Sequence, residues 1–343
     1  MSHDGNFYLH VFRVEEGLGN AVLVVLPDGR RGIVDWGTQE PAAIEKALQL
    51  APDGFAFVAA THAHADHVLG LERLIEACVE RNRKIGYVAF PATTNHKADC
   101  PLTLALRRAL HLGIKLSRVD LKDYEGTAWK PGLLVHDHDL TWSVAVLAPS
   151  CSVVASAEIA GLERGIVPGN ETSLVLLLRF HAPGDGPGMG QVLLPGDATM
   201  STLRQAREAG ARLELSLDNQ ALLVPHHGSS NNLPGWLVDV SHGVAVVSGR
   251  EDSDHHPSAD SLARLGTRCR DADGSRLYCT SYARACRTTF GARAVAEDRS
   301  WTEPGPCFGD LTIRVSPRAP AAVVGTSAQG AHRRRFGYCG SHL

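Results

Sequence analysis

The stretch from Thr61 to His67 reads Thr-His-Ala-His-Ala-Asp-His and holds four potential metal ligands within six positions: His62, His64, Asp66 and His67. Imidazole nitrogens and carboxylate oxygens are ligands that zinc, manganese and iron accept. The alanines between the ligands are small, so the loop can fold tightly around an ion. A histidine-rich surface loop that binds nothing is the alternative. Further ligand candidates downstream favour the metal site.

These seven residues directly follow the apolar segment 55–60 (FAFVAA), which predicts a short buried strand. The ligands are therefore expected on a loop at the C-terminal end of a strand, where α/β proteins commonly place their chemistry. A helix is expected over residues 67–81, because Leu69, Leu74 and Ile75 form an apolar face. This strand, loop and helix would position the ligands.

Strand-like and helix-like segments alternate along the rest of the chain, which predicts an α/β fold. We expect strands at 7–14, 21–26, 31–35, 85–89, 114–119, 132–136, 141–148, 172–180, 191–195, 220–224, 243–247, 276–280 and 310–315. We expect helices at 41–50, 97–112, 199–209, 232–239 and 258–265.

Composition agrees with a globular enzyme. The 343 residues are enough for one large domain or two small ones, and 44% of them are apolar, so the chain can bury a sizeable core. The net charge of −3 argues against a nonspecific nucleic-acid binder, which would carry a basic excess. The basic triplet Arg333–Arg335 is expected to be solvated, with contact to an anionic partner as the alternative.

No segment of the sequence indicates a membrane protein. The N-terminus lacks a basic segment followed by an apolar stretch, so we expect no signal peptide. No apolar run approaches the roughly 18 residues needed to span a bilayer, so we expect a cytoplasmic protein without membrane contact.

None of the eight cysteines forms a CxxC pair, and free buried thiols are therefore expected. A disulfide or a second metal site near the C-terminus is the alternative.

An HxHxDH motif after a strand is the signature of the metallo-β-lactamase superfamily. Six further segments resemble, in the same order, those of the metallo-β-lactamase-like domain of ComEC-type DNA-uptake proteins. The segments are His10–Ala21 (HVFRVEEGLGNA), Gly32–Gly37 (GIVDWG), Asn170–Leu174 (NETSL), Leu193–Ala198 (LLPGDA), Leu223–Ser230 (LVPHHGSS) and Val246–Pro257 (VVSGREDSDHHP). Each motif alone is weakly specific. Together they resemble a free-standing relative of that domain, one without its membrane helices.

The resemblance implies the four-layer αβ/βα sandwich of this superfamily. The hydrolase domain would cover residues 1–315 and include a cysteine-containing insert at 281–309. Residues 316–343 would form a flexible C-terminal tail.

The resemblance also implies a centre with two divalent metal ions, zinc by expectation and manganese as the alternative. His62 and His64 would bind the first ion, and Asp66 and His67 the second. Asp197 would bridge both ions, since a carboxylate has two oxygens for two cations.

His227 would complete the second site, while His226 would orient or contact the substrate. The two are not expected to bind one ion together, because adjacent side chains on an extended segment point oppositely. Many superfamily members supply a further histidine to the first site, and no clear match exists here. The candidates, each more typical of a surface position, are His96, His136, His138 and His181.

Five residues are expected to act around the metals. Asp66 would orient the attacking water as well as bind metal, and His256 would stabilise a phosphate oxygen or protonate the leaving group. Asp35 would support the metal loop by hydrogen bonding. Asn170 and Ser173 would shape the pocket, with turn chemistry before a strand as the alternative.

Two cations would hold a bridging water as hydroxide and polarise the bond under attack. We therefore expect a phosphodiesterase or nuclease that acts on a nucleic acid or nucleotide, and the PHHGS and HP segments favour this branch. A hydrolase of lactones, thioesters or other carbon–oxygen bonds is the second hypothesis. A noncatalytic binding module is the third, and the intact ligand set argues against it. The sequence indicates no particular protein partner.

Overall fold

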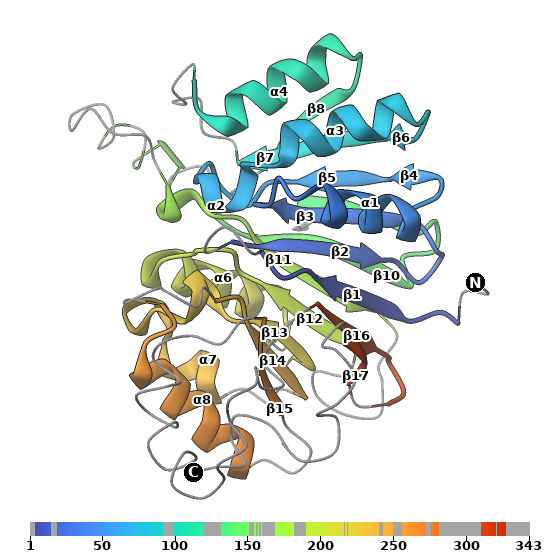
Figure 1. The fold of residues 1–343 in the computed structure, drawn as a ribbon. Helices are drawn as coiled ribbons and strands as arrows, with labels where there is room; N and C mark the ends of the chain where they lie inside the picture. Colours follow the sequence, from blue (N-terminus) through green and yellow to red (C-terminus); the bar gives the residue numbers. More distant parts are fainter. Residues whose placement is uncertain are drawn as a thin grey trace, which may run out of the picture.

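The fold is described from a computed structural model (Figure 1). It describes residues 4–14, 19–91, 99–119, 132–150, 154–155, 157, 159, 169–181, 190–215, 217, 219–239, 243–249, 256–271, 276–280, 310–319 and 321–326. The expected insert at 281–309, the basic triplet and His96 lie outside these residues.

One large sheet is built mainly from the N-terminal half. Within the described residues it has eight strands in the order β17-β16-β1-β2-β3-β5-β7-β8. Their bounds are β1 Phe7–Val11, β2 Ala21–Val25, β3 Arg31–Trp36, β5 Phe57–Ala59, β7 Tyr87–Pro91, β8 Lys115–Val119, β16 Leu311–Val315 and β17 Ala322–Thr326. Because β3, β5 and β7 are parallel, their C-terminal ends meet at one edge.

The second large sheet comes from the C-terminal half. Its strands, counted over the described part of the chain, number seven in the order β15-β14-β13-β12-β11-β10-β9. Their bounds are β9 Gly132–His136, β10 Trp142–Ala148, β11 Val175–Phe180, β12 Gln191–Leu194, β13 Ala221–Leu223, β14 Val244–Val247 and β15 Arg276–Cys279. Strands β12 to β15 are parallel, so the loops that follow them also share one edge.

The helices cover the outer faces of the two sheets (Figure 1). Helices α1 Pro41–Leu50, α3 Leu71–Glu80 and α4 Pro101–His111 pack on the first sheet. Helices α6 Met200–Arg212, α7 Gly235–Asp239 and α8 Ala259–Asp271 pack on the second. The inner faces of the sheets share a third apolar core. This is the predicted four-layer αβ/βα sandwich.

The central strands are apolar on both faces because both faces are buried. In β11, Leu176 and Leu178 lie in the core between the sheets, whereas Val175 and Leu177 contact the helical layer. Successive side chains of a strand point to opposite faces, so a strand between two layers needs a continuous apolar run. None of the helices in the described residues is both long and apolar enough to cross a lipid bilayer.

The structure corrects several predicted boundaries. The strand expected at 55–60 is divided into β4 Gly54–Phe55, which pairs with β6 Lys84–Ile85, and β5. The strand expected at 172–180 begins only at Val175, after a 3-10 helix at Asn170–Thr172. Part of the expected tail is not a tail, because β17 pairs with β16 in the first sheet. The remainder of the domain boundaries stays a prediction.

Two of the three cysteines whose side chains are described are buried, as expected. These are Cys78 and Cys279, and neither forms a disulfide bond among the described residues. Cys100 is free but only partly buried, and its sulfur accepts a hydrogen bond from the Thr103 amide at the start of α4. Burial raises the pKa of Cys78 to about 12, so this thiol stays protonated.

The helix expected at 67–81 is broken into α2 Ala65–Val68 and α3. Gly70 lies at the break, and its amide donates to the Trp36 carbonyl at 3.0 Å. A side chain at this position would place its Cβ 1.6 Å from the Thr38 carbonyl oxygen. This close approach lets the turn after β3 hold the short helix α2, which carries Asp66 and His67.

Replacing Gly70 by alanine is expected to lower the free energy of unfolding by about 3 kcal/mol, because the backbone would have to move apart. Thermal or denaturant unfolding measures the loss. Gly235→Ala is the control, since a Cβ at the start of α7 would meet nothing within 4 Å. Equal stability of the two variants would contradict the role of the Gly70 contact.

Candidate metal centre

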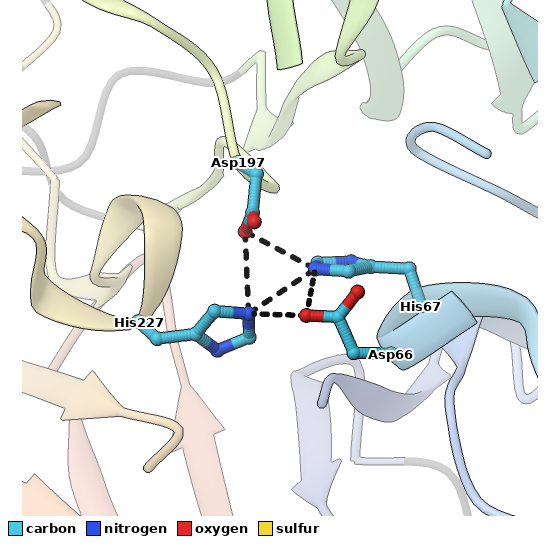
Figure 2. Close-up of side chains that lie close together, drawn as sticks. All are labelled: Asp66, His67, Asp197 and His227. Atoms are coloured by element: carbon cyan, nitrogen blue, oxygen red, sulfur yellow. Dashed lines mark hydrogen bonds and ion pairs between the residues drawn. The ribbon is translucent and has the colours of Figure 1, made fainter. Parts of the chain in front are cut away.

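Loops from both sheets meet at one end of the sandwich. The first sheet contributes Asp35 at the end of β3 and the loop of residues 61–67 after β5. The second sheet contributes Asp197 after β12 and His227 after β13. Figure 2 shows Asp66, His67, Asp197 and His227 pointing toward one another from three separate segments. The edges on which parallel strands end therefore assemble the site.

Four of the predicted ligands form a compact group, Asp66, His67, Asp197 and His227, with ligand atoms all within 4.8 Å of one another. The Nε2 atoms of His67 and His227 are 3.3 Å apart. The Asp197 Oδ1 atom is 3.1 Å from His67 Nε2 and 3.5 Å from His227 Nε2. This is the set predicted for the second metal.

A second group brings together His62, His64 and Asp66, again with ligand atoms within 4.8 Å. Asp197 Oδ2 is 3.9 Å from His62 Nε2, so this carboxylate faces both groups. Asp66 also belongs to both groups, which the sequence did not predict. His64 is exposed, and a Cβ on Gly169 would be only 2.4 Å from its Nε2 atom.

Two buried polar atoms at the centre, His62 Nε2 and Asp197 Oδ1, find no hydrogen-bond partner among the described residues, although Asp197 Oδ1 forms an ion pair with His67. Both side chains are almost fully buried, at 0% and 2% exposure. Buried polar atoms without partners are costly and uncommon in folded proteins. Cations bound between these atoms would satisfy both, so the residues present fit a pair of metal ions.

Asp35 holds the ligand loop as predicted. Its carboxylate accepts hydrogen bonds from the Thr61 amide at 2.6 Å, the Thr61 hydroxyl at 2.8 Å and His67 Nδ1 at 2.6 Å. Because the Thr61 hydroxyl donates to Asp35, it can accept from His62 Nδ1 at 3.2 Å. With their Nδ1 protons directed away, both histidines present Nε2 to the centre.

His227 is oriented by hydrogen bonds that were not predicted from the sequence. Its Nδ1 atom lies 3.2 Å from the Ser248 carbonyl and 2.9 Å from the Ser248 hydroxyl. A carbonyl oxygen only accepts, so Nδ1 carries the proton and Nε2 is left for a metal. The Ser248 hydroxyl in turn donates to the Asn20 side chain. Ser248 lies 21 positions from His227 and 228 positions from Asn20 along the chain, and no local pattern pointed to these contacts.

Asp197 is held by a tight turn. Gly196 has a φ of +54°, and a Cβ there would lie 2.5 Å from the Ser173 hydroxyl and 2.7 Å from the Thr61 hydroxyl. The Asp197 amide donates to the Ser173 hydroxyl at 3.1 Å. Ser173 thus contacts the backbone beside the predicted bridging carboxylate, although its direct contact with substrate stays a prediction.

His226 and His227 do not lie on an extended segment, so the reason given for their opposite directions was wrong. Both have left-handed backbone, with φ of +49° and +51°, in a 3-10 turn at Pro225–Gly228. The His226 amide donates to the Gly196 carbonyl at 3.0 Å. Its Nε2 atom lies 3.8 Å from Asp197 Oδ2, and its side chain belongs to neither ligand group.

The remaining predicted residues surround His226. The ring of His256 lies 5.1 Å from that of His226 between centroids. The Asn170 amide nitrogen is 3.4 Å from His226 Nε2. Both predicted residues therefore border the metal centre from the side of the second sheet.

The described candidates for a further first-site histidine lie away from it. The side chain of His138 is fully exposed beside Asp139. His136 Nδ1 donates to the Asp137 carbonyl, and His181 hydrogen-bonds the Ser143 hydroxyl at 2.7 Å. None of the three belongs to a ligand group among the described residues.

The charges of the group are strongly coupled. Burial lowers the pKa of His67, but the carboxylates of Asp197 and Asp35 raise this pKa more, to well above its ordinary value. Burial and the neighbouring His67 hold the pKa of His62 well below its ordinary value. Burial raises the pKa of Asp66, yet the hydrogen bond with His227 and the charge of His67 bring it down to about 2. Asp66 is therefore ionised at neutral pH.

A family model described as the metallo-beta-lactamase superfamily matches residues 14–201, more than half of the chain. The chain belongs to this superfamily. It is therefore a member of a family of metal-dependent hydrolases, and its histidine and aspartate cluster fits the dinuclear metal binding of this fold. No curated protein matches the chain.

Several solved structures are similar to this chain at low identity. A diphosphatase of the PhnP family is 13% identical, with 80% of this chain and 85% of that chain covered and a TM-score of 0.39. The protein YhfI from Bacillus subtilis is 12% identical, with 80% and 96% covered and a TM-score of 0.41. A long form of RNase Z from yeast is 12% identical, with 82% and 38% covered and a TM-score of 0.38.

Replacing Ser248 by alanine is expected to weaken zinc binding at the second site by about 10- to 100-fold, because His227 loses the hydroxyl that fixes its ring. Competition with a chromophoric chelator measures the affinity. Ser117→Ala, in the edge strand β8, is the matched control. Unchanged zinc affinity in Ser248→Ala would show that the backbone carbonyl of residue 248 alone is enough to orient the His227 ring.

Metal binding is expected to release a proton from His67, whose raised pKa keeps the metal-free side chain charged at neutral pH. Zinc affinity should then fall by up to about tenfold for each unit that the pH decreases. In the metal-free protein this charge stabilises the fold fully below the ordinary histidine pKa of about 6.5, and the contribution is lost as pH rises through the raised value. Titration calorimetry in two buffers of different ionisation enthalpy measures how many protons are released when zinc binds. Identical heats in both buffers would contradict its release.

Proposed function

We propose that this protein is a metal-dependent phosphodiesterase that acts on a nucleic acid or nucleotide, and that it is a relative of the ComEC-type domain. The observation that carries the proposal is the meeting of the PHHGS and HP segments beside the metal centre. The Ser258 amide donates to the Gly228 carbonyl at 3.0 Å, and a Cβ on Gly228 would lie 2.8 Å from Pro257. The rings of His226 and His256 consequently lie next to each other.

Two imidazoles beside a carboxylate-rich centre suit a phosphodiester. This substrate class has negatively charged non-bridging oxygens that need cations and a leaving oxygen that needs a hydrogen-bond donor. Burial lowers the pKa of His226, which keeps this ring neutral at neutral pH. A neutral imidazole can still donate one hydrogen bond to a substrate oxygen.

His62, His64, Asp66, His67, Asp197 and His227 would hold two divalent cations, zinc by our proposal and manganese as the alternative. When bound, such a pair activates water as a nucleophile near neutral pH and stabilises negative charge on the phosphoryl group. Asp66 is ionised and partly exposed, so its carboxylate can accept a hydrogen bond from the attacking water and orient it. His256 would then face the leaving oxygen from the HP segment.

Cleavage of end-labelled single-stranded DNA with added Mn²⁺ or Zn²⁺ tests this function. The parent protein should cut the strand, and Asp197→Ala should lose activity by on the order of 1000-fold, because several kcal/mol of charge stabilisation depend on the shared carboxylate. Asp139→Ala is the matched control, since its side chain is 81% exposed and lies away from the site.

Absence of cutting by the parent with either metal would contradict a general DNA nuclease. Hydrolysis assays with bis(4-nitrophenyl) phosphate and cyclic dinucleotides then show whether the protein cleaves smaller phosphodiesters or only a carbonyl substrate. Hydrolysis of a lactone or thioester alone would overturn the phosphodiesterase proposal in favour of the carbon–oxygen and thioester branch.

A further inference from the structure

Asn170 lies in a segment that passes directly beside the first metal site. At the start of this segment, a Cβ on Gly169 would be only 2.4 Å from His64 Nε2. At its end, the Ser173 hydroxyl accepts a hydrogen bond from the Asp197 amide at 3.1 Å. The backbone between these two contacts is a single 3-10 turn. Asn170 is therefore held between a predicted ligand of the first ion and the predicted bridging carboxylate.

The side-chain carbonyl oxygen of Asn170, Oδ1, is buried and finds no hydrogen-bond partner among the described residues. His62 Nε2, a predicted ligand of the first ion, is in the same state. The amide nitrogen of Asn170 lies 3.5 Å and 3.4 Å from the two ring nitrogens of His226, so the oxygen is the end of the amide that this ring does not meet. Buried carbonyl oxygens without partners are uncommon, because nothing offsets their loss of hydration.

The two oxygens of Asp197 indicate which ion Asn170 would reach. Asp197 Oδ1 faces the second site, at 3.1 Å from His67 Nε2. Asp197 Oδ2 faces the first site, at 3.9 Å from His62 Nε2, and it lies 3.8 Å from His226 Nε2. Since the Asn170 amide meets the same His226 ring, Asn170 lies on the first-ion side of the carboxylate.

A cation suits the Asn170 oxygen better than a phosphodiester does. An amide oxygen only accepts hydrogen bonds, and the non-bridging oxygens of a phosphodiester also only accept, so the two cannot pair. Carbonyl oxygens are ordinary ligands of divalent cations such as manganese. The first site can also take a further ligand, since none of the described candidate histidines belongs to it.

We propose that Asn170 is a direct ligand of the first metal ion through Oδ1, in the place of a further histidine. The ligand set then combines the imidazoles of His62 and His64 with oxygens of Asp66, Asp197 and Asn170. Imidazole suits zinc, whereas carboxylate and carbonyl oxygens suit manganese. The first site therefore accepts manganese more readily than a site with a third imidazole would. The inference rests on the metal pair of the proposed function and not on the reaction.

Two substitutions of nearly equal size separate the oxygen from the shape of the side chain. Asn170→Leu removes the oxygen, and Asn170→Asp keeps one at the same position. Electron paramagnetic resonance of free Mn²⁺, during a titration of metal-free protein, counts the bound ions and measures the affinity of each.

The parent should bind two Mn²⁺ ions. Asn170→Leu should bind one of them at least about 10-fold more weakly, a loss that even an outer partner of a ligand causes. Asn170→Asp should bind both at least as tightly as the parent. Parental affinity for both ions in Asn170→Leu, or equal losses in the two variants, would overturn the proposal.

The His62→Ala background assigns the loss to one site, because it removes an imidazole of the first site alone. Adding Asn170→Leu to this background should leave the affinity for the tighter ion unchanged, since two ligands of one ion do not have independent effects on the other ion. Weaker binding of the tighter ion in the double variant would place Asn170 at the second site and overturn the proposal.

Asn231→Leu is the matched control, since it makes the same chemical change at an exposed position near the centre. It should bind both ions as the parent does. A loss equal to that of Asn170→Leu would make the effect nonspecific, and the proposal would fail. Circular dichroism and a thermal melt establish that each variant is folded.

Asn170→His tests the same contact through a gain. An imidazole in place of the amide oxygen should shift the preference of the first site from manganese toward zinc. Competition between the two metals for the protein measures the ratio of their affinities. An unchanged ratio would contradict direct contact between this side chain and the ion. This measurement decides the question even where Asn170→Leu does not fold.

The proposed function can fail separately from this inference. A parent that binds two Mn²⁺ ions and does not hydrolyse bis(4-nitrophenyl) phosphate or DNA would overturn the phosphodiesterase, while the titrations would still decide the role of Asn170. A parent that binds one ion only, with the same affinity as Asn170→Leu, would overturn the ligand role.

Discussion

The metal centre depends on one buried carboxylate, that of Asp35. This side chain is 2% exposed and accepts three hydrogen bonds, two from Thr61 at the beginning of the ligand loop and one from His67 at its end. A single anion therefore determines where the loop starts, where it closes and which nitrogen His67 directs inward. Without it, buried donors of the loop would lack partners, and such unpaired groups are costly.

The ligand rings face the carboxylates across the space in which the cations would lie. Asp66 Oδ2 lies 3.3 Å from His227 Nε2, and Asp197 Oδ1 lies 3.1 Å from His67 Nε2. Each ring directs its other nitrogen to a fixed acceptor, Asp35 for His67 and Ser248 for His227. A polar centre can therefore exist inside an apolar sandwich, because the rings of His62, His67 and His227 are oriented before a metal arrives.

The sequence alone predicted the parts of this structure that have a local cause. The spacing of the histidines and Asp66 indicated the ligand loop, and apolar runs such as residues 172–180 indicated strands. Asp197 and His227 followed only from the resemblance to a family, since nothing local connects them with residues 61–67. The roles of Asn20 and Ser248 escaped prediction, because each depends on a tertiary contact. The break of the helix at Gly70 was missed for the same reason, as the contact with Thr38 is not visible in periodicity.

The ligands come from both sheets, and this division has a mechanical consequence. His67 is anchored in the first sheet and His227 in the second, while the Leu174 amide donates to the Thr61 carbonyl across the same boundary at 2.9 Å. Metal ions bound between His67 and His227 would link the two sheets at one end of the sandwich. Chelation would then open that end first, and proteases would find their earliest cleavage sites in the ligand loops rather than in the outer helices.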